Sequence, residues 1–282
     1  MPLSINTNIA SMTAQRAMLN SNSALETSFE RLSTGKRVNS AVDDAAGLAI
    51  GKELESRVSG LNQAIRNTND GISIIQIAEG ALDEVTTILQ RVRDLAVQAA
   101  NDSLSADERT YLKNEANALI DSFEDVTAAA KWNGSSVFTA TDFVFQTGAD
   151  NTDTTTINIG LGTPGHFLDA TGANASLANA KTDVTIDSNT NANASLVKID
   201  AAITDVASTR AQLGAYQAQL ESTVRNLANV AENTAAAAGR IMDTDYAAET
   251  ANLTKAQILQ QAATSILAQA NAQPQSVLSL LQ

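Results

Sequence analysis

Apolar residues recur at alternating spacings of three and four at both ends of this 282-residue chain, and the spacing is lost in between. It runs from about Ser40 to Trp132 and again from about Ser195 to Gln282, whereas residues 133–194 are rich in Thr, Asn, Asp and Gly. This period predicts amphipathic helices that pack against other helices. No such helix buries its stripe alone, so we expect the two ends to pair. The predicted fold is mainly α: an elongated, coiled-coil-like helical rod with a small β-hairpin region.

The longest predicted helix runs from Asp44 to Ala100, about 85 Å at 1.5 Å per residue. Its apolar stripe comprises Leu54, Val58, Leu61, Ile65, Thr68, Ile72, Ile75, Ala78, Leu82, Val85, Leu89, Val92, Ala96 and Ala99. We expect Ser40 and Asp43 to cap its start, because a hydroxyl or carboxylate there accepts from unpaired backbone N–H groups. The adjacent Asp43 and Asp44 are therefore interpreted as helix-start residues rather than a catalytic pair.

The remaining helices follow the same spacing. Ser105 with Glu108 predicts a capping box before a stripe of Leu112, Ala116, Leu119, Phe123, Val126 and Ala130. A return helix from Ser195 to Ile241 carries Leu196, Ile199, Ile203, Val206, Leu213, Leu220, Val224, Leu227, Ala231 and Ile241. The first helix has Ile5, Ile9, Met12, Leu19, Leu25, Phe29 and Leu32 and is expected to stop at Gly35. The last has Ala256, Leu259, Ala263, Ile266 and Ala270, and we expect Pro274 to interrupt it.

The middle of the chain predicts one hairpin and one loop. Residues 142–147 and 154–159 alternate apolar and polar like half-buried strands, with a turn over 148–153. Residues 160–193 are typical of an irregular surface loop.

Charge and composition exclude several functions. The formal net charge is −13, and the 18 Lys and Arg residues form no basic stripe, so nucleic acid is not an expected partner. There is no Cys, which excludes disulfides and thiolate chemistry. No apolar run reaches the 18 residues of a membrane span, and residues 1–10 lack the charged and apolar regions of a signal peptide, so these rules alone predict a cytoplasmic protein.

Nothing in the sequence predicts catalysis. His166 is the single histidine and stands in a Gly/Pro loop, which favours a surface residue over a ligand or base. No paired-histidine zinc motif, dinucleotide fingerprint or phosphate-binding loop is present. We therefore expect no enzyme activity, no cofactor and no metal.

Blocks of residues at both ends resemble the bacterial flagellins, the subunits of the flagellar filament. They are Ile5–Asn8, Glu30–Gly35, Asp43–Ile50, Asn69–Ser73, Gln90–Gln98, Trp132–Gly134, Asp243–Ala247, Ala256–Ala262, Ala268–Asn271 and Val277–Leu281. The resemblance covers both helical ends, about three quarters of the chain by the helix limits above.

The resemblance implies a division into four parts. These are a terminal coiled-coil domain lining the filament core (1–33 and 246–282), linkers (34–43 and 242–245), a helical rod domain (44–132 and 194–241), and a hairpin with a surface loop (133–193). It also implies an extracellular protein of the flagellar filament, exported without a cleavable signal peptide, which replaces the cytoplasmic prediction.

The resemblance further implies particular residues and partners. Polymerisation would use Ile5, Ile9, Met12, Leu25, Phe29, Leu32, Leu259, Ala263, Ile266, Val277, Leu278, Leu280 and Leu281. Contacts with the host's flagellin-sensing Toll-like receptor would use Gln90, Arg91, Leu95 and Glu115. An export chaperone would hold the C-terminal arm, and filament cap and junction proteins would contact the polymer. Candidate O-glycan acceptors are Ser135, Ser136, Thr139 and Thr163.

Two alternatives share parts of this pattern. The hook–filament junction protein has the same terminal architecture, although the apolar C-terminal block and the Gln90–Val97 stretch favour a filament subunit. A flagellin with an enzymatic insert would need the paired-histidine motif that this sequence lacks.

Overall fold

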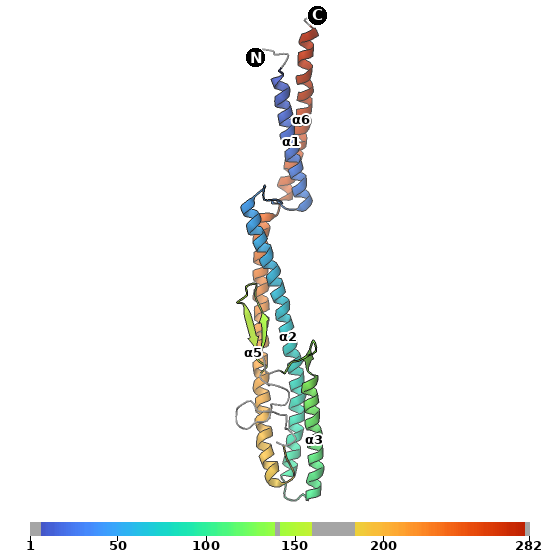
Figure 1. Ribbon diagram of the computed structural model, residues 1–282, viewed down its shortest axis with the longest axis vertical. Helices are drawn as coiled ribbons and strands as arrows, with labels where there is room; N and C mark the ends of the chain where they lie inside the picture. Colours follow the sequence, from blue (N-terminus) through green and yellow to red (C-terminus); the bar gives the residue numbers. More distant parts are fainter. Residues whose placement is uncertain (1–6, 139–141, 160–183, 280–282) are drawn as a thin grey trace. The chain divides into compact units, whose positions relative to one another are not determined.

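The protein is mainly α-helical, as the apolar spacing predicts. The computed structural model describes residues 7–138, 142–159 and 184–279, without the side chains of 273–279. Within these ranges the helices are α1 (Ile9–Thr34), α2 (Ala45–Ala99), α3 (Ala106–Ala129), α5 (Asn189–Met242) and α6 (Tyr246–Ser279) (Figure 1). The strands are β1 (Lys131–Trp132), β2 (Ser135–Ser136), β3 (Phe143–Gln146) and β4 (Thr154–Ile157).

The chain forms two compact units. The first comprises residues 1–58 and 232–282, and the second comprises residues 59–231. Helices α2 and α5 contribute residues to both units, so each unit is described by itself. The four-part domain division stays a prediction.

The second unit is built on one apolar core shared by α2, α3 and α5. Ile75, Leu82 and Val85 of α2 are at most 1% exposed and belong to the same cluster as Phe123 of α3 and Leu213 of α5. The stripes predicted for these three helices are buried or half-buried at every position, which confirms them. Burying a side chain of this size stabilises the fold by about 1.5–3 kcal/mol, so the core dominates the stability of this unit.

Ion pairs link α2 to α5 along the edge of this core. The Arg93 Nε lies 2.6 Å from Asp200 Oδ1. The guanidinium of Arg210 contacts Glu79 at 2.7 Å and Asp83 at 3.1 Å. Arg210 occupies a stripe position that the sequence leaves polar, and its two carboxylate partners satisfy the charge there.

The helix ends confirm most of the capping predictions and correct one. The Ser105 hydroxyl accepts from the Glu108 N–H, and the Glu108 carboxylate accepts from the Ser105 N–H, which completes the capping box of α3. At α2, Asp44 Oδ1 accepts from the Gly47 N–H at 2.8 Å, so Asp44 caps the helix and Ser40 does not. Instead, the Asp43 carboxylate accepts from the Ser40 N–H and hydroxyl in the preceding turn, because the helix begins only at Ala45.

Two antiparallel hairpins lie between α3 and α5 in the sequence. β1 and β2 are joined by Asn133 and Gly134, both with positive φ, as a two-residue turn of this hand requires. β3 pairs with β4 from Phe143–Ile157 to Gln146–Thr154, which confirms the predicted hairpin. The second hairpin contacts α2 at Gly71, where an added Cβ would stand 3.5 Å from the Phe145 ring.

Two further predictions about helix limits are wrong. α5 begins at Asn189 rather than Ser195, since Ser188 accepts from Asn191 and Ala192 and starts the helix in a stretch without apolar spacing. α6 continues through Pro274 to Ser279, because one proline removes a single backbone donor while the flanking residues stay helical. The stop at Gly35 is confirmed by its left-handed φ of 72°. Residues 160–183 of the predicted loop, His166 among them, lie outside the described residues.

Candidate self-assembly surface

The first unit contains an antiparallel pair of helices, α1 and α6, that meet along a seam of small residues (Figure 1). Its buried members on α1 are Ser11, Ala14, Ser21 and Ser28, with Met18, Leu25 and Leu32 half-buried. On α6 they are Glu249, Ala256, Ala263 and Ala270, with Leu253, Gln260 and Leu267 half-buried. Both sets alternate steps of three and four, so the contact is a heptad seam in which small side chains bring the helices close together.

Polar bonds tie the two helices in one register. Ser11 Oγ donates to Asn271 Oδ1 at 2.8 Å, and Gln260 Nε2 donates to Asn22 Oδ1 at 2.7 Å. The buried positions of the seam are mostly Ala and Ser, which offer little apolar area by which to choose a register, so these directional bonds help to specify it.

Seven large apolar residues of these helices lie outside this seam. Ile9, Met12, Leu19 and Phe29 of α1, and Ile258, Leu259 and Ile266 of α6, are between 49% and 69% exposed. The stripe predicted for the last helix is therefore partly confirmed, because Ala256, Ala263 and Ala270 lie in the seam. Of the stripe predicted for the first helix, Leu25 and Leu32 lie in the seam, and the other described members face away from it. On α1, the sequence signal that the prediction missed was the run of small residues at intervals of seven, Ala14, Ser21 and Ser28.

The predicted polymerisation residues divide by position. Ile9, Met12, Phe29, Leu259 and Ile266 are exposed, Leu25 and Leu32 are half-buried, and Ala263 is buried in the seam. Ile5, Leu280 and Leu281 lie outside the described residues, as do the side chains of Val277 and Leu278.

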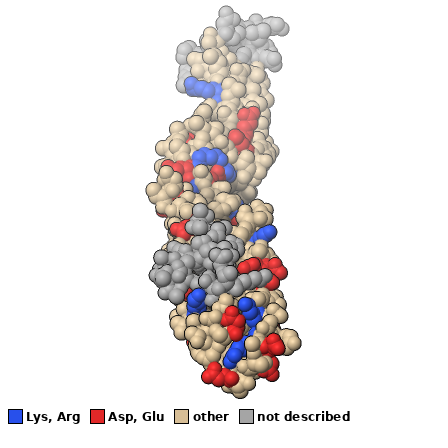
Figure 2. Space-filling model, turned by 60° about the horizontal axis from the view of Figure 1, so that its bottom comes forward, with Lys and Arg blue, Asp and Glu red and all other residues tan. Residues whose placement is uncertain are grey.

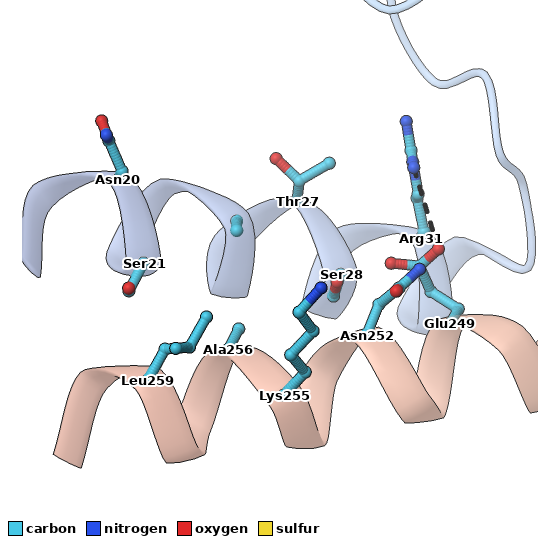
Figure 3. Close-up of a pocket in the computed structure, with 11 residues that line it drawn as sticks. Asn20, Ser21, Thr27, Ser28, Arg31, Glu249, Asn252, Lys255, Ala256 and Leu259 are labelled. Carbon is cyan, nitrogen blue, oxygen red and sulfur yellow. Dashed lines mark ion pairs between the residues drawn. The ribbon is translucent and has the colours of Figure 1, made fainter. Parts of the chain in front are cut away.

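A groove of about 460 Å³ runs along one side of the seam (Figure 3). α1 lines it with residues at helical spacing, Asn20, Ala24, Thr27 and Arg31, and α6 lines it with Asn252, Lys255 and Leu259. The Arg31 Nη1 lies 3.7 Å from Glu249 Oε2, whose side chain is 8% exposed. The Arg31 Nε is buried and makes no hydrogen bond. Lys255 extends from α6 toward α1 and has no ion pair within residues 7–138, 142–159 and 184–279.

The segment after α1 is joined to the end of α5 within the same unit. Lys36 forms a β-bridge with Asp243, and the Arg37 N–H donates to the Met242 carbonyl oxygen at 2.7 Å. The Lys36 and Lys52 ammonium groups contact the two oxygens of Glu55 at 2.6 and 2.8 Å. Lys36 first, and Lys52 second, lower the pKa of Glu55 to about 2.

The predicted receptor residues lie on α2 and α3 in the second unit. Arg91 donates to Glu115 Oε1 from Nη2 at 2.7 Å and from Nε at 3.2 Å, and both side chains are exposed. Gln90 is exposed beside them. Leu95 is 2% exposed because it belongs to the apolar core, so it supports this surface from beneath rather than forming part of it.

On the face drawn in Figure 2, Lys and Arg are interspersed with Asp and Glu. Of the candidate glycan acceptors, Ser135 is exposed and Ser136 half-buried in β2, whereas Thr139 and Thr163 lie outside the described residues. Among the helices of the described residues, none is long and apolar enough to span a membrane, and no cluster of candidate metal ligands occurs in the same residues.

An exposed apolar surface on paired terminal helices is typical of structural subunits that assemble with copies of themselves. Comparison with known proteins identifies the class further. The model of the bacterial flagellin N-terminal helical region matches residues 5–142, and that of the C-terminal helical region matches residues 196–281. The chain belongs to the bacterial flagellin family.

Full-length relatives agree with this assignment. The chain is 41% identical over 286 residues to the flagellar filament 33 kDa core protein of Treponema phagedenis and 40% identical over 303 residues to the flagellin of Bacillus subtilis, with 99% of each chain covered. A solved structure of a putative flagellar hook-associated protein from Vibrio parahaemolyticus shares the fold, with a TM-score of 0.61 at 20% identity over 71% of this chain and 100% of that one. The protein is a structural subunit that polymerises into the bacterial flagellar filament, an extracellular assembly.

Proposed function

We propose that the exposed apolar residues of α1 and α6 form the surface by which one subunit binds the next. The observation that carries this proposal is the separation of two sets of residues on the same helices. Small residues occupy most buried positions of the seam, whereas seven large apolar residues are left exposed: Ile9, Met12, Leu19, Phe29, Ile258, Leu259 and Ile266. Because each of these side chains is already partly covered, full burial by a neighbour would contribute roughly 1–2 kcal/mol per side chain.

The terminal helices would become fully ordered only in the polymer. The buried apolar members of their seam, Ala14, Ala256, Ala263 and Ala270, offer little area to offset the conformational entropy of ordering two long helices. Neighbouring subunits would supply the missing burial, so that folding of the terminal helices is coupled to assembly.

Further partners follow from membership of the family. A chaperone that covers α6 before assembly would bind the exposed apolar residues Ile258, Leu259 and Ile266. Filament cap and junction proteins would meet the same terminal helices at the ends of the polymer. Export without a cleavable signal peptide, the absence of enzyme activity and glycosylation of Ser135, Ser136, Thr139 or Thr163 belong to the same proposal.

The Toll-like receptor surface would consist of Gln90, Arg91 and Glu115. The Arg91–Glu115 pair is exposed on both sides, so a receptor can reach it, but it also links α2 to α3. We expect Arg91→Ala to reduce receptor binding about tenfold while changing unfolding by less than about 1 kcal/mol, since surface ion pairs contribute little. A loss of receptor binding that is accompanied by a loss of unfolding free energy would assign Arg91 a structural role only.

The assembly surface is tested with the variant Leu19→Gln combined with Ile266→Gln. Both side chains are exposed, so the substitutions leave the seam intact. We expect the critical concentration for seeded elongation, measured by sedimentation, to rise at least about tenfold, because two apolar contacts of more than 1 kcal/mol are lost. Val144→Gln is the matched control, since Val144 of β3 is 63% exposed and lies in the second unit. Equal elongation by both variants would refute the proposal.

A further inference from the structure

We propose that the groove between α1 and α6 binds the carboxylates of Glu26 and Glu30 from the α1 helix of a second copy of this chain. The inference rests on the proposed assembly function and deepens it, since it assigns a specific electrostatic contact to the surface between subunits.

The groove carries an excess of positive charge in an acidic protein. Arg31 and Lys255 line it together with a single carboxylate, that of Glu249, while the whole chain has a net charge of −13. Glu249 is the nearly buried partner of Arg31, so the Lys255 ammonium is left over. The groove therefore attracts an anion.

The donors in the groove are incompletely used. The Arg31 Nε is buried without an acceptor, so this guanidinium is incompletely satisfied within the subunit. Its partner Glu249 lies at 3.7 Å, longer than a good charge-assisted hydrogen bond of about 2.7–2.9 Å. The Asn252 amide extends from α6 toward α1 in the same space and suits a carboxylate oxygen.

Glu26 and Glu30 are the matching carboxylates on the same helix pair. They stand four residues apart on α1, so they share one face of the helix and repel each other. Both are exposed, neither lines the groove, and neither has an ion pair with any described residue. A positive groove and a separate acidic edge on one body produce a head-to-tail contact, which is the kind of contact that propagates into an open helical polymer.

The test measures seeded elongation of the full-length chain in about 10 mM and about 1 M salt, between which the screening length falls from about 30 Å to about 3 Å. Four variants are compared with the wild type: Lys255→Glu; Glu26→Lys with Glu30→Lys; all three substitutions together; and Lys131→Glu. Lys131 of β1 is exposed in the second unit and serves as the matched control.

In low salt, we expect Lys255→Glu and the Glu26→Lys/Glu30→Lys variant each to raise the critical concentration about fivefold to tenfold, the scale of a few surface ion pairs. The variant with all three substitutions restores complementary charges between its own copies, so its critical concentration returns toward the wild-type value. It adds poorly to wild-type seeds, because its charges do not match those of the wild type. In high salt these differences shrink, and Lys131→Glu behaves as wild type throughout.

Two results would overturn the pairing alone, provided that the wild type elongates normally. One is a critical concentration for Lys255→Glu that equals that of Lys131→Glu. The other is a variant with all three substitutions whose critical concentration does not return toward the wild-type value. A wild-type chain that fails to elongate would overturn the proposed function, and the pairing with it. Lys255→Gln, which keeps the size of the side chain without reversing its charge, should show a smaller rise in the same direction. No rise for Lys255→Gln would count against the pairing.

Discussion

Asn8 and Ala270, which stand 262 positions apart in the chain, are joined by a 2.7 Å hydrogen bond from Asn8 Nδ2 to the Ala270 carbonyl oxygen. The same Asn8 side chain accepts from the Ser11 N–H and caps α1. One residue therefore starts the first helix and fixes its position on the last. Directional polar bonds therefore help to hold the two ends of the chain together, because the buried positions of the seam between them are mostly small residues.

Replacing Asn8 should weaken assembly without affecting the second unit. Asn8→Ala removes the cap and the tie together, and loss of an N-cap alone costs about 0.5–2 kcal/mol. We expect the critical concentration for elongation to rise and the thermal unfolding of the core to stay unchanged, measured by sedimentation and calorimetry. Asn8→Ser, which keeps a capping oxygen but not the amide donor, should give a smaller rise in critical concentration.

Two glycines of α2 should respond in opposite directions to alanine. A Cβ on Gly51 would lie 2.4 Å from Met242 Sδ and 2.5 Å from Met242 Cγ, and Met242 is 2% exposed. Gly51→Ala should therefore destabilise the first unit by about 1–3 kcal/mol through overpacking. A Cβ on Gly80 meets nothing within 4 Å, so Gly80→Ala should stabilise α2 by up to about 1 kcal/mol. Denaturant unfolding checks both, and destabilisation by Gly80→Ala would contradict the packing described.

Acid should remove the contribution of the Lys36–Glu55–Lys52 cluster. The pKa of Glu55 is lowered from 4.5 to about 2, so its ionised form is favoured by folding. That stability is fully present above the ordinary pKa and is lost as pH falls from about 4.5 toward 2. Glu55 is half-exposed, so screening limits the contribution to less than about 1 kcal/mol. Near neutral pH the wild type should have a larger free energy of unfolding than Glu55→Gln, and the two values should converge at about pH 2. A difference that persists at pH 2 would contradict a contribution from the Glu55 ion pairs.

The core of the second unit should be sensitive to loss of volume. Leu82 is fully buried among α2, α3 and α5, and Leu82→Ala should cost about 2–5 kcal/mol of unfolding free energy. Val97, which is 49% exposed on the same helix, provides the comparison, and Val97→Ala should change unfolding by less than about 0.5 kcal/mol. Similar losses in the two variants, measured by urea denaturation, would show that the core lies elsewhere.

The second unit follows from the sequence more fully than the first. Leu82 and Val85 are large, apolar and buried, so the spacing that predicts their helix also predicts its buried face. In α1 the large residues Met12 and Leu19 also lie at helical spacing, but Ser21 is the residue that is buried. One face of such a helix packs within the subunit, and another face is left for its neighbours. Each face has its own pattern in the sequence, and a prediction from apolar spacing follows the face with the larger apolar residues.

The polar contacts of the candidate site were beyond sequence reasoning. Glu249 repeats at a seven-residue interval with Ala256, yet nothing local indicates that Arg31, more than 200 residues away, is its partner. The same holds for Lys255, whose lack of an ion pair in the described residues depends on which side of the seam it occupies. Helical periodicity predicts which residues share a face, but not which face of another helix they meet.

Electron microscopy of a chain that ends at Asp245, mixed with seeds of the full-length protein, tests whether α1 and α6 together carry assembly. Without α6 the seam of α1 has no partner and three of the seven exposed apolar residues are gone, whereas the core of α2, α3 and α5 is untouched. We predict no elongation, together with cooperative thermal unfolding of the second unit close to that of the full-length chain. Filaments of normal length from the truncated chain would contradict the central claim that α1 and α6 together carry assembly.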